Sequence, residues 1–226
     1  MKTIKTDTKK IVGIAVFASL AFVVALVCQV IPPVAGFLSL DAKDAVIAIA
    51  SFIYGPTSAV IIAFIAALIE FLTISTTGWY GFIMNFASSA VFSLTASLIY
   101  KRFRNINGAL VSFFAAVAAT TAVMLLLNRF VTPIYLFDYL GAMPEAAARE
   151  YVIGILPTVL LPFNFAKSLM NSAIAMLLYK PVANAMKHAK LASGSLGNGG
   201  FNKNSVIILV LGSVGLVVSI LILLFI

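Results

Sequence analysis

Six polar side chains lie inside long apolar stretches of the sequence, where a polar group is costly and marks a candidate site. Three of them are asparagines, each in a different predicted helix, near the end expected to face outward. A side-chain amide carries a donor and an acceptor, so such a set suits a neutral, heteroaromatic ligand with alternating donors and acceptors. Hydrogen-bonded pairs between helices would account for the same residues. The six are Glu70, Asn85, Asn128, Arg129, Asn164 and Lys167.

Lys167 follows Asn164 by about one turn, so both side chains project from nearly the same helix face. Pro162, just before them, favours a helix that begins inside the membrane layer. A buried ammonium group needs a carbonyl, a carboxylate or a ligand as its partner. Lys167 is therefore expected either to pair with Glu70 or to bind a ligand.

The segment from Pro32 to Asp44 is too apolar for a loop that is free in solvent. It is expected to fold back as a lid over an outward cavity. Asp44 is expected to cap the helix that follows, because aspartate accepts from the first free N–H groups of a helix. Trp79 and Tyr80 are interpreted either as aromatic residues of the membrane interface or as part of the site.

No catalytic motif is present in the sequence. There is no G-x-x-x-x-G-K-[ST] loop for a nucleotide phosphate and no G-x-S-x-G elbow. His188 and Cys28 are the single histidine and the single cysteine, so no cluster of these residues can hold a metal ion. We therefore expect no enzyme activity, no metal and no cofactor.

The elements that position these residues are membrane helices. Of the 226 residues, 62% are hydrophobic and 10% are charged, against about 45–50% and about 25% in soluble domains. The apolar stretches are continuous rather than alternating, which favours helices over a strand barrel. The net charge of +8 is attributed to the membrane rather than to nucleic acid, because the basic residues cluster between apolar segments. The fold class is an all-α, polytopic membrane protein.

We predict a six-helix bundle over residues 1–190, a flexible Gly/Ser/Asn linker over 191–204, and an extra C-terminal transmembrane helix over 205–226. The last helix is interpreted as an anchor or a packing helix. A long loop is expected from Tyr135 to Arg149. The six helices are Ile11 to Ile31, Asp44 to Tyr54, Thr57 to Thr73, Tyr80 to Tyr100, Gly108 to Val131, and Pro157 or Pro162 to Met186.

The distribution of charge sets the orientation. Lysine and arginine cluster on one side of this topology and most acidic residues on the other, which places the N-terminus in the cytoplasm and the C-terminus outside. Small residues line one arc of the first helix and would let another helix approach closely, whether from this chain or from a partner. They are Ala15, Ala18, Ala21 and Ala25.

Four segments, in this order and spacing, resemble the S components of energy-coupling factor (ECF) vitamin transporters, and the last resembles the riboflavin-specific branch through its P-F-N-x-x-K. The resemblance covers about Ile11 to Lys187. The segments are Leu38-Ser39-Leu40-Asp41-Ala42-Lys43-Asp44, Ser51-Phe52-Ile53-Tyr54-Gly55-Pro56, Gly81-Phe82-Ile83-Met84-Asn85-Phe86, and Leu127-Asn128-Arg129-Phe130 with Leu161-Pro162-Phe163-Asn164-Phe165-Ala166-Lys167.

The resemblance implies a subunit of the bacterial cell membrane that captures riboflavin at the outer face. It would dock on a transmembrane T component and two ATPases, and the alanine stripe resembles the family's docking face. Asn128, Asn164 and Lys167 would bind the isoalloxazine ring, and Leu40 with the Gly78-Trp79 loop would cover it. The matching motifs also place these residues in or near the site: Asp41, Gly81, Asn85 and Phe163.

The sequence departs from the family at two places. Riboflavin members often carry Lys-Asn where Ala66-Ala67 stand and Asn where Glu70 stands. These positions concern the contacts to the ribityl chain. An S component for thiamine, folate, biotin or pantothenate is an open alternative. So is a non-transport membrane assembly protein, in which the polar residues only join helices.

Overall fold

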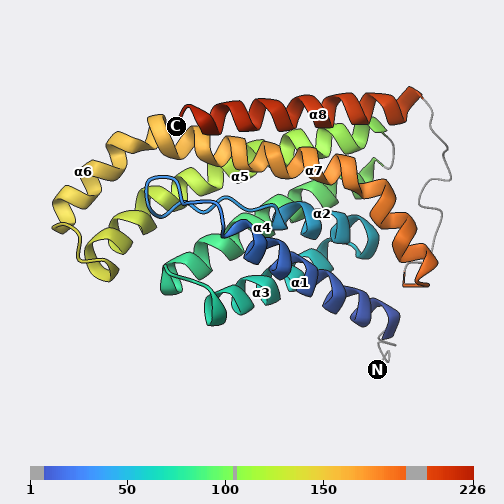
Figure 1. The fold of residues 1–226 in the computed structure, drawn as a ribbon, viewed down its shortest axis with the longest axis horizontal. Helices are drawn as coiled ribbons and strands as arrows, with labels where there is room; N and C mark the ends of the chain where they lie inside the picture. The colour runs from blue at the N-terminus through green and yellow to red at the C-terminus, as the bar shows by residue number, and fades with distance from the viewer. Residues whose placement is uncertain (1–7, 104–105, 192–202) are drawn as a thin grey trace.

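A computed structural model describes residues 8–103, 106–191 and 203–226 of the chain. These residues form a bundle of helices, with one isolated bridge between Val34 and Leu38. Figure 1 shows the long helices running along the molecule. The helices are α1 (Thr8–Cys28), α2 (Lys43–Tyr54), α3 (Pro56–Thr73), α4 (Gly78–Arg102), α5 (Ile106–Ile134), α6 (Glu145–Ile155), α7 (Leu161–His188) and α8 (Lys203–Leu224), with π-helical segments at Tyr135–Tyr139 (η1) and Leu156–Leu160 (η2).

The predicted fold class is confirmed. Within the described residues, six helical segments are long and apolar enough to cross a membrane. The 12-residue α2 is too short to be one of them, and it lies among α1, α3, α4 and α7. The division into 1–190, 191–204 and 205–226 stays a prediction, since most of residues 191–204 lie outside the described part of the chain.

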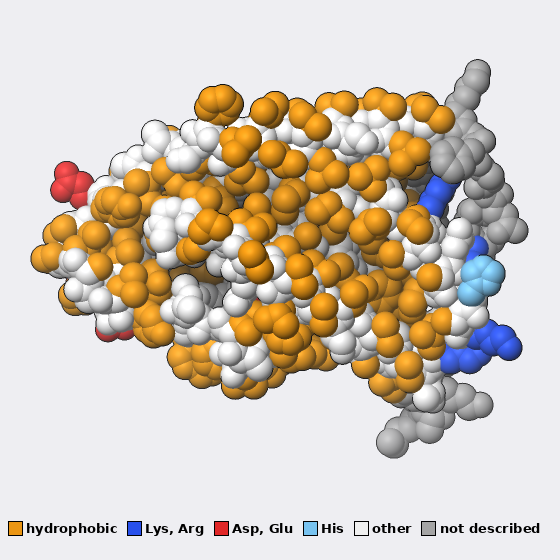
Figure 2. All heavy atoms as spheres, viewed as in Figure 1, with side chains coloured by type: hydrophobic (Ala, Val, Ile, Leu, Met, Phe, Trp, Pro, Cys, Tyr) orange, Lys and Arg blue, Asp and Glu red, His pale blue; other side chains and the backbone are white. Residues whose placement is uncertain are grey.

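The two ends of the bundle differ in charge. Lysine and arginine side chains gather at the end where α1 begins, whereas the acidic side chains visible in Figure 2 lie at the opposite end. Between the two ends the surface is apolar, as a membrane requires. Because α1 begins at the basic end, the loop after Cys28 lies at the acidic end.

The loop expected from Tyr135 to Arg149 is wrong for most of its length. Helix α5 continues through Pro133 into η1, and α6 begins at Glu145. A proline is tolerated in a membrane helix where a local π-helical adjustment accommodates the lost hydrogen bond. Helix α6 is stabilised by an alanine run and by the Glu145–Arg149 ion pair at 2.6 Å, which has the favourable (i, i+4) spacing.

Three of the four alanines of the α1 stripe pack inside this chain, which corrects the expected docking role for those three. Ala18, Ala21 and Ala25 are buried, and α1 contacts α2 and α3. Ala15 alone of the four is exposed. The close approach that small residues permit is therefore used within the bundle.

Helix α8 packs along α7 (Figure 1). The contact depends on two glycines: a Cβ added at Gly212 would lie 2.9 Å from Leu177 Cγ, and one at Gly215 would lie 3.3 Å from Ala173 Cβ. Near the end of α8, Leu223 packs against the apolar cluster that surrounds the start of α7. Of the two interpretations of the last helix, packing is the one that the structure supports.

We expect Gly212→Leu to lower the thermal stability of the purified protein, because the new side chain overpacks the α7–α8 contact. Overpacking of this kind costs about 1–3 kcal/mol. Val214→Leu, at an exposed position of the same helix, is the matched control and should change little. Equal unfolding temperatures for the two variants in detergent would contradict the close contact.

Candidate ligand-binding site

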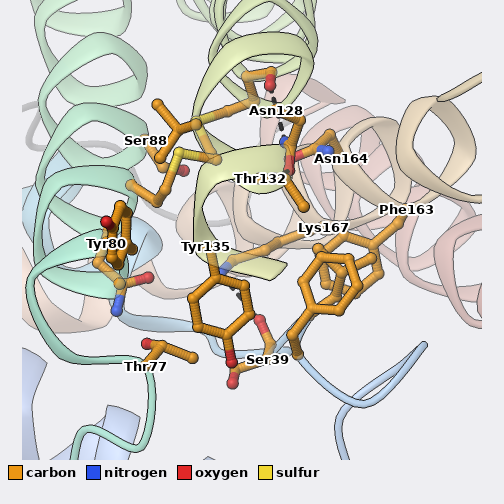
Figure 3. A pocket seen from close by; sticks show the side chains of 17 residues that line it. Ser39, Thr77, Tyr80, Ser88, Asn128, Thr132, Tyr135, Phe163, Asn164 and Lys167 are labelled. Carbon is orange, nitrogen blue, oxygen red and sulfur yellow. Dashed lines mark hydrogen bonds between the residues drawn. The ribbon is translucent and has the colours of Figure 1, made fainter. Parts of the chain in front are cut away.

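A cavity with an empty volume of about 690 Å³, including space open to solvent, lies toward the acidic end of the bundle. Side chains line it from α4, α5, η1, α7 and the lid loop, which is the segment between α1 and α2 (residues 29–42) (Figure 3). Its polar lining residues carry mostly amides and hydroxyls, and its other lining residues are apolar or aromatic. The lining residues are Phe37, Leu38, Ser39, Thr77, Tyr80, Gly81, Met84, Asn85, Ser88, Met124, Asn128, Val131, Thr132, Tyr135, Phe163, Asn164 and Lys167.

The three predicted asparagines all line this cavity. Asn128 and Asn164 are buried, and each Nδ2 donates to a carbonyl of its own helix at 2.7 Å. Asn128 Oδ1 accepts from Thr132 Oγ1 at 2.8 Å. These bonds fix the amides toward the cavity, so the alternative of pairing between helices does not describe these two residues.

Lys167 does not pair with Glu70, so the first of its two expected roles is wrong. Its Nζ donates to Asp41 Oδ2 at 2.7 Å and to the carbonyl oxygen of Ser39 at 3.1 Å. Both partners belong to the lid loop, so the ammonium group binds the lid while it lines the cavity. Asp41 therefore reaches the site through Lys167 rather than by lining the cavity itself.

Glu70 instead pairs with Lys43, whose Nζ lies 2.6 Å from Glu70 Oε2. The same carboxylate oxygen accepts from Asn85 Nδ2 at 3.2 Å. Lys43 Nζ also lies 3.8 Å from Asp41 Oδ2. The result is a chain of buried charges that runs from α7 through the lid and the start of α2 to α3.

The expected cap at Asp44 is also wrong. Its carboxylate accepts from the hydroxyls of Ser88, at 3.3 Å, and Ser89 on α4, and makes no capping bond. The start of α2 is held from another helix, because the N–H of Ala45 donates to Asn171 Oδ1 on α7 at 2.8 Å. Sequence spacing cannot reveal such a cap, since its two partners are 126 residues apart.

Tyrosines form the outer part of the cavity wall. Tyr80 and Tyr135 line the cavity, with ring centroids 6.0 Å apart, and Tyr139 packs against both. Tyr80 Oη donates to Asp138 at 2.7 Å, which joins α4 to η1. Of the two interpretations of Tyr80, the structure places it in the site.

Besides Asp41, two other predicted site residues, Leu40 and Trp79, do not line the cavity. The side chain of Trp79 is 62% exposed and packs on Phe71 at a centroid distance of 4.2 Å. Leu40 packs against the apolar cluster beside the cavity. The cover comes instead from Phe37, Leu38 and Ser39 of the lid loop.

Gly81 does line the cavity, as does Phe163. A Cβ at Gly81 would overlap the hydroxyl of Thr77, so the glycine keeps bare backbone at this part of the wall. Helical periodicity around the predicted residues would have found several lining residues that the sequence analysis missed, because they stand three or four positions away on the same faces. They are Thr77, Met84, Ser88, Met124, Val131 and Thr132.

The side chains around the cavity are suited to binding a small molecule. Amides, hydroxyls and one ammonium group face a cavity with apolar and aromatic walls, the pattern of small-molecule sites. Among the described residues, no group of three or more His, Cys, Asp or Glu side chains is arranged to hold a metal ion.

Fold and site together define a polytopic membrane protein that binds a small molecule in a cavity near one end of its helical bundle. Residues 9–179 match the family "ECF transporter, substrate-specific component", and the chain belongs to this family. It is a transporter component, not an enzyme.

Known relatives agree with this assignment. The chain is 30% identical to the riboflavin transporter RibU of Staphylococcus aureus (strain TCH60), over 80% of this chain and 94% of the relative. It is 26% identical to the riboflavin transporter FmnP of Bacillus subtilis (strain 168), over 76% and 90%. A solved S component of a bacterial ECF transporter superposes with a TM-score of 0.65 at 28% identity, over 80% of this chain and 99% of that one.

Proposed function

We propose that this chain is the riboflavin-capturing S component of an ECF transporter in a bacterial cell membrane. It binds the vitamin in the cavity beneath the lid loop and passes it to a T component driven by two ATPases. The observation that carries the proposal is the convergence of Asn128, Asn164 and Lys167 on one cavity wall. The similarity to two riboflavin transporters supports it.

The chemistry of the cavity fits a flavin. The edge of the isoalloxazine ring alternates donors and acceptors, which amides on α5 and α7 complement. The ring faces are apolar and would lie against the side chains of Phe163, Met124 and Tyr135. A cavity of this kind buries most of a small ligand.

The proposed orientation places the N-terminus in the cytoplasm and the C-terminus outside. The basic end of the bundle is then cytoplasmic, in agreement with the positive-inside rule. The cavity lies toward the other end, where it meets vitamin outside the cell.

The experiment that tests the function is the absorbance and fluorescence spectrum of the full chain purified in detergent. Bound riboflavin gives a yellow protein and is released on denaturation at close to one per chain. If the protein is colourless, riboflavin is titrated into it, and quenching of flavin fluorescence supports the proposal. Absence of quenching contradicts it, and thiamine is then titrated. Binding of no vitamin supports a membrane assembly protein.

The exposed face of α1 is proposed to dock on the T component, and two substitutions separate docking from folding. Ala15→Trp, at an exposed position, is expected to keep riboflavin binding and to reduce riboflavin uptake in cells that carry the partner subunits. Ala21→Trp, at a fully buried position, is expected to destabilise the fold itself because the core has no room for an indole. Normal uptake with Ala15→Trp would contradict docking at this face.

A further inference from the structure

Three polar side chains of the cavity wall each donate a hydrogen bond to a carboxylate behind the wall. Asn85 donates to Glu70 at 3.2 Å, and Lys167 donates to Asp41 at 2.7 Å. Ser88 donates to Asp44 at 3.3 Å. The carboxylates come from α3, the lid loop and α2, so a layer of buried acidic groups lies directly behind the lining.

This layer carries more negative than positive charge. Its carboxylates are Asp41, Asp44 and Glu70, and its ammonium groups are Lys43 and Lys167, so the formal charge of these five residues is minus one. All five are at most 8% exposed. Buried charges are screened by salt far less than surface charges, and they interact several times more strongly than in water. A charged ligand group that enters the cavity therefore interacts with the electric field of these five residues.

The hydrogen bonds also decide what the wall offers to a ligand. The Ser88 hydroxyl gives its proton to Asp44, so its oxygen faces the cavity as an acceptor. Asn85 uses one amide proton on Glu70, and its Oδ1 has no hydrogen-bond partner among the described residues. Lys167 spends two of its three donors on Asp41 and Ser39. The α4 side of the cavity thus suits hydroxyl donors rather than anionic acceptors.

We infer that Glu70 and Asp44 make the cavity selective for uncharged ligands, so that it accepts riboflavin and rejects riboflavin 5′-phosphate. Neither residue lines the cavity; each acts through a lining side chain, Asn85 or Ser88. The inference rests on the proposed function. It also predicts poor binding of vitamins that carry a carboxylate, such as folate and pantothenate.

The test compares two ligands on the same full-length protein in detergent. Dissociation constants for riboflavin and riboflavin 5′-phosphate are measured by quenching of flavin fluorescence in wild type, Glu70→Gln, Asp44→Asn and the double variant. Gln and Asn keep the shape and an acceptor oxygen while each removes one negative charge. We expect the ratio of the two constants, phosphate over riboflavin, to fall about tenfold for each charge removed. Because only folded protein binds either ligand, the ratio is insensitive to partial unfolding.

Glu145→Gln is the matched control. It removes the same charge from an exposed carboxylate of α6, which pairs only with Arg149 among the described residues, and its ratio should stay at the wild-type value. A ratio unchanged in Glu70→Gln and Asp44→Asn, or equal losses of both affinities, would overturn the selectivity role and leave these residues structural. If wild type bound neither flavin, the proposed function would fail instead, so the two failures are distinct.

Discussion

Replacing Lys43 with methionine is expected to destabilise the folded protein by about 3–5 kcal/mol, the usual cost of removing one partner of a buried ion pair. Methionine matches the volume of the lysine stem but leaves Glu70 without its cation. The Glu70 carboxylate already lacks one hydrogen bond, because its Oε1 atom is buried without a partner. The loss of Lys43 would leave Asn85 as its single donor among the described residues.

The measurement is the free energy of unfolding in detergent, compared with Lys101→Met at an exposed position near the basic end. A double variant, Lys43→Met with Glu70→Leu, tests the pairing directly. Removing both partners of a buried pair is often close to neutral, so the double variant should recover much of the loss. If Lys43→Met cost no more than Lys101→Met, the buried pair would not stabilise the fold.

The second large effect concerns the ligand. Asn164→Leu is expected to weaken riboflavin binding at least tenfold, which corresponds to about 1.4 kcal/mol. Leucine has nearly the same volume, and the lost bond to the Leu160 carbonyl is local, between α7 and the last residue of η2, so the fold should persist. The substitution removes the amide that faces the cavity. A polar ligand group that loses this partner is buried without a hydrogen bond, which costs the free energy of its desolvation.

Ser172→Ala is the control for this variant. Ser172 lies on the same helix, is buried and has no hydrogen-bond partner for its hydroxyl, so its removal should change neither binding nor stability. Calorimetric or fluorescence titration of both variants gives the comparison. An unchanged riboflavin affinity in Asn164→Leu would remove this residue from the site.

Sequence alone predicted the fold class and most helices because membrane helices leave a strong signal in hydropathy. It missed α6, whose residues are more polar and lie at the end of the bundle, where no continuous apolar stretch marks a helix. It also ended the fifth helix too early, at Val131, whereas α5 continues through Pro133, because in a membrane the loss of one hydrogen bond does not end a helix that its neighbours support.

The sequence predicted most residues of the candidate site, but it did not predict which of its cations pairs with which carboxylate. Polar residues in apolar helices are conspicuous, so Asn85, Asn128, Asn164 and Lys167 were identified. Which cation meets which carboxylate depends on how the helices are arranged. Lys43 falls in the segment Pro32 to Asp44 that was predicted to be a lid loop, but it is buried at the start of α2. The prediction that Trp79 covers the ligand was wrong for a related reason, because this side chain packs on Phe71 outside the cavity.

The buried charges also impose an order on the biosynthesis of the chain. Lys43 meets Glu70 27 residues later, but the Lys167 that neutralises Asp41 is 126 residues away. At about 5–20 residues per second, the ribosome needs roughly 6–25 seconds to make that stretch. During that interval the short, charged α2 cannot settle between helices that do not yet exist. The insertion machinery must therefore keep it hydrated or shielded until α7 emerges, and we expect the N-terminal half to acquire its native contacts only when synthesis is nearly finished.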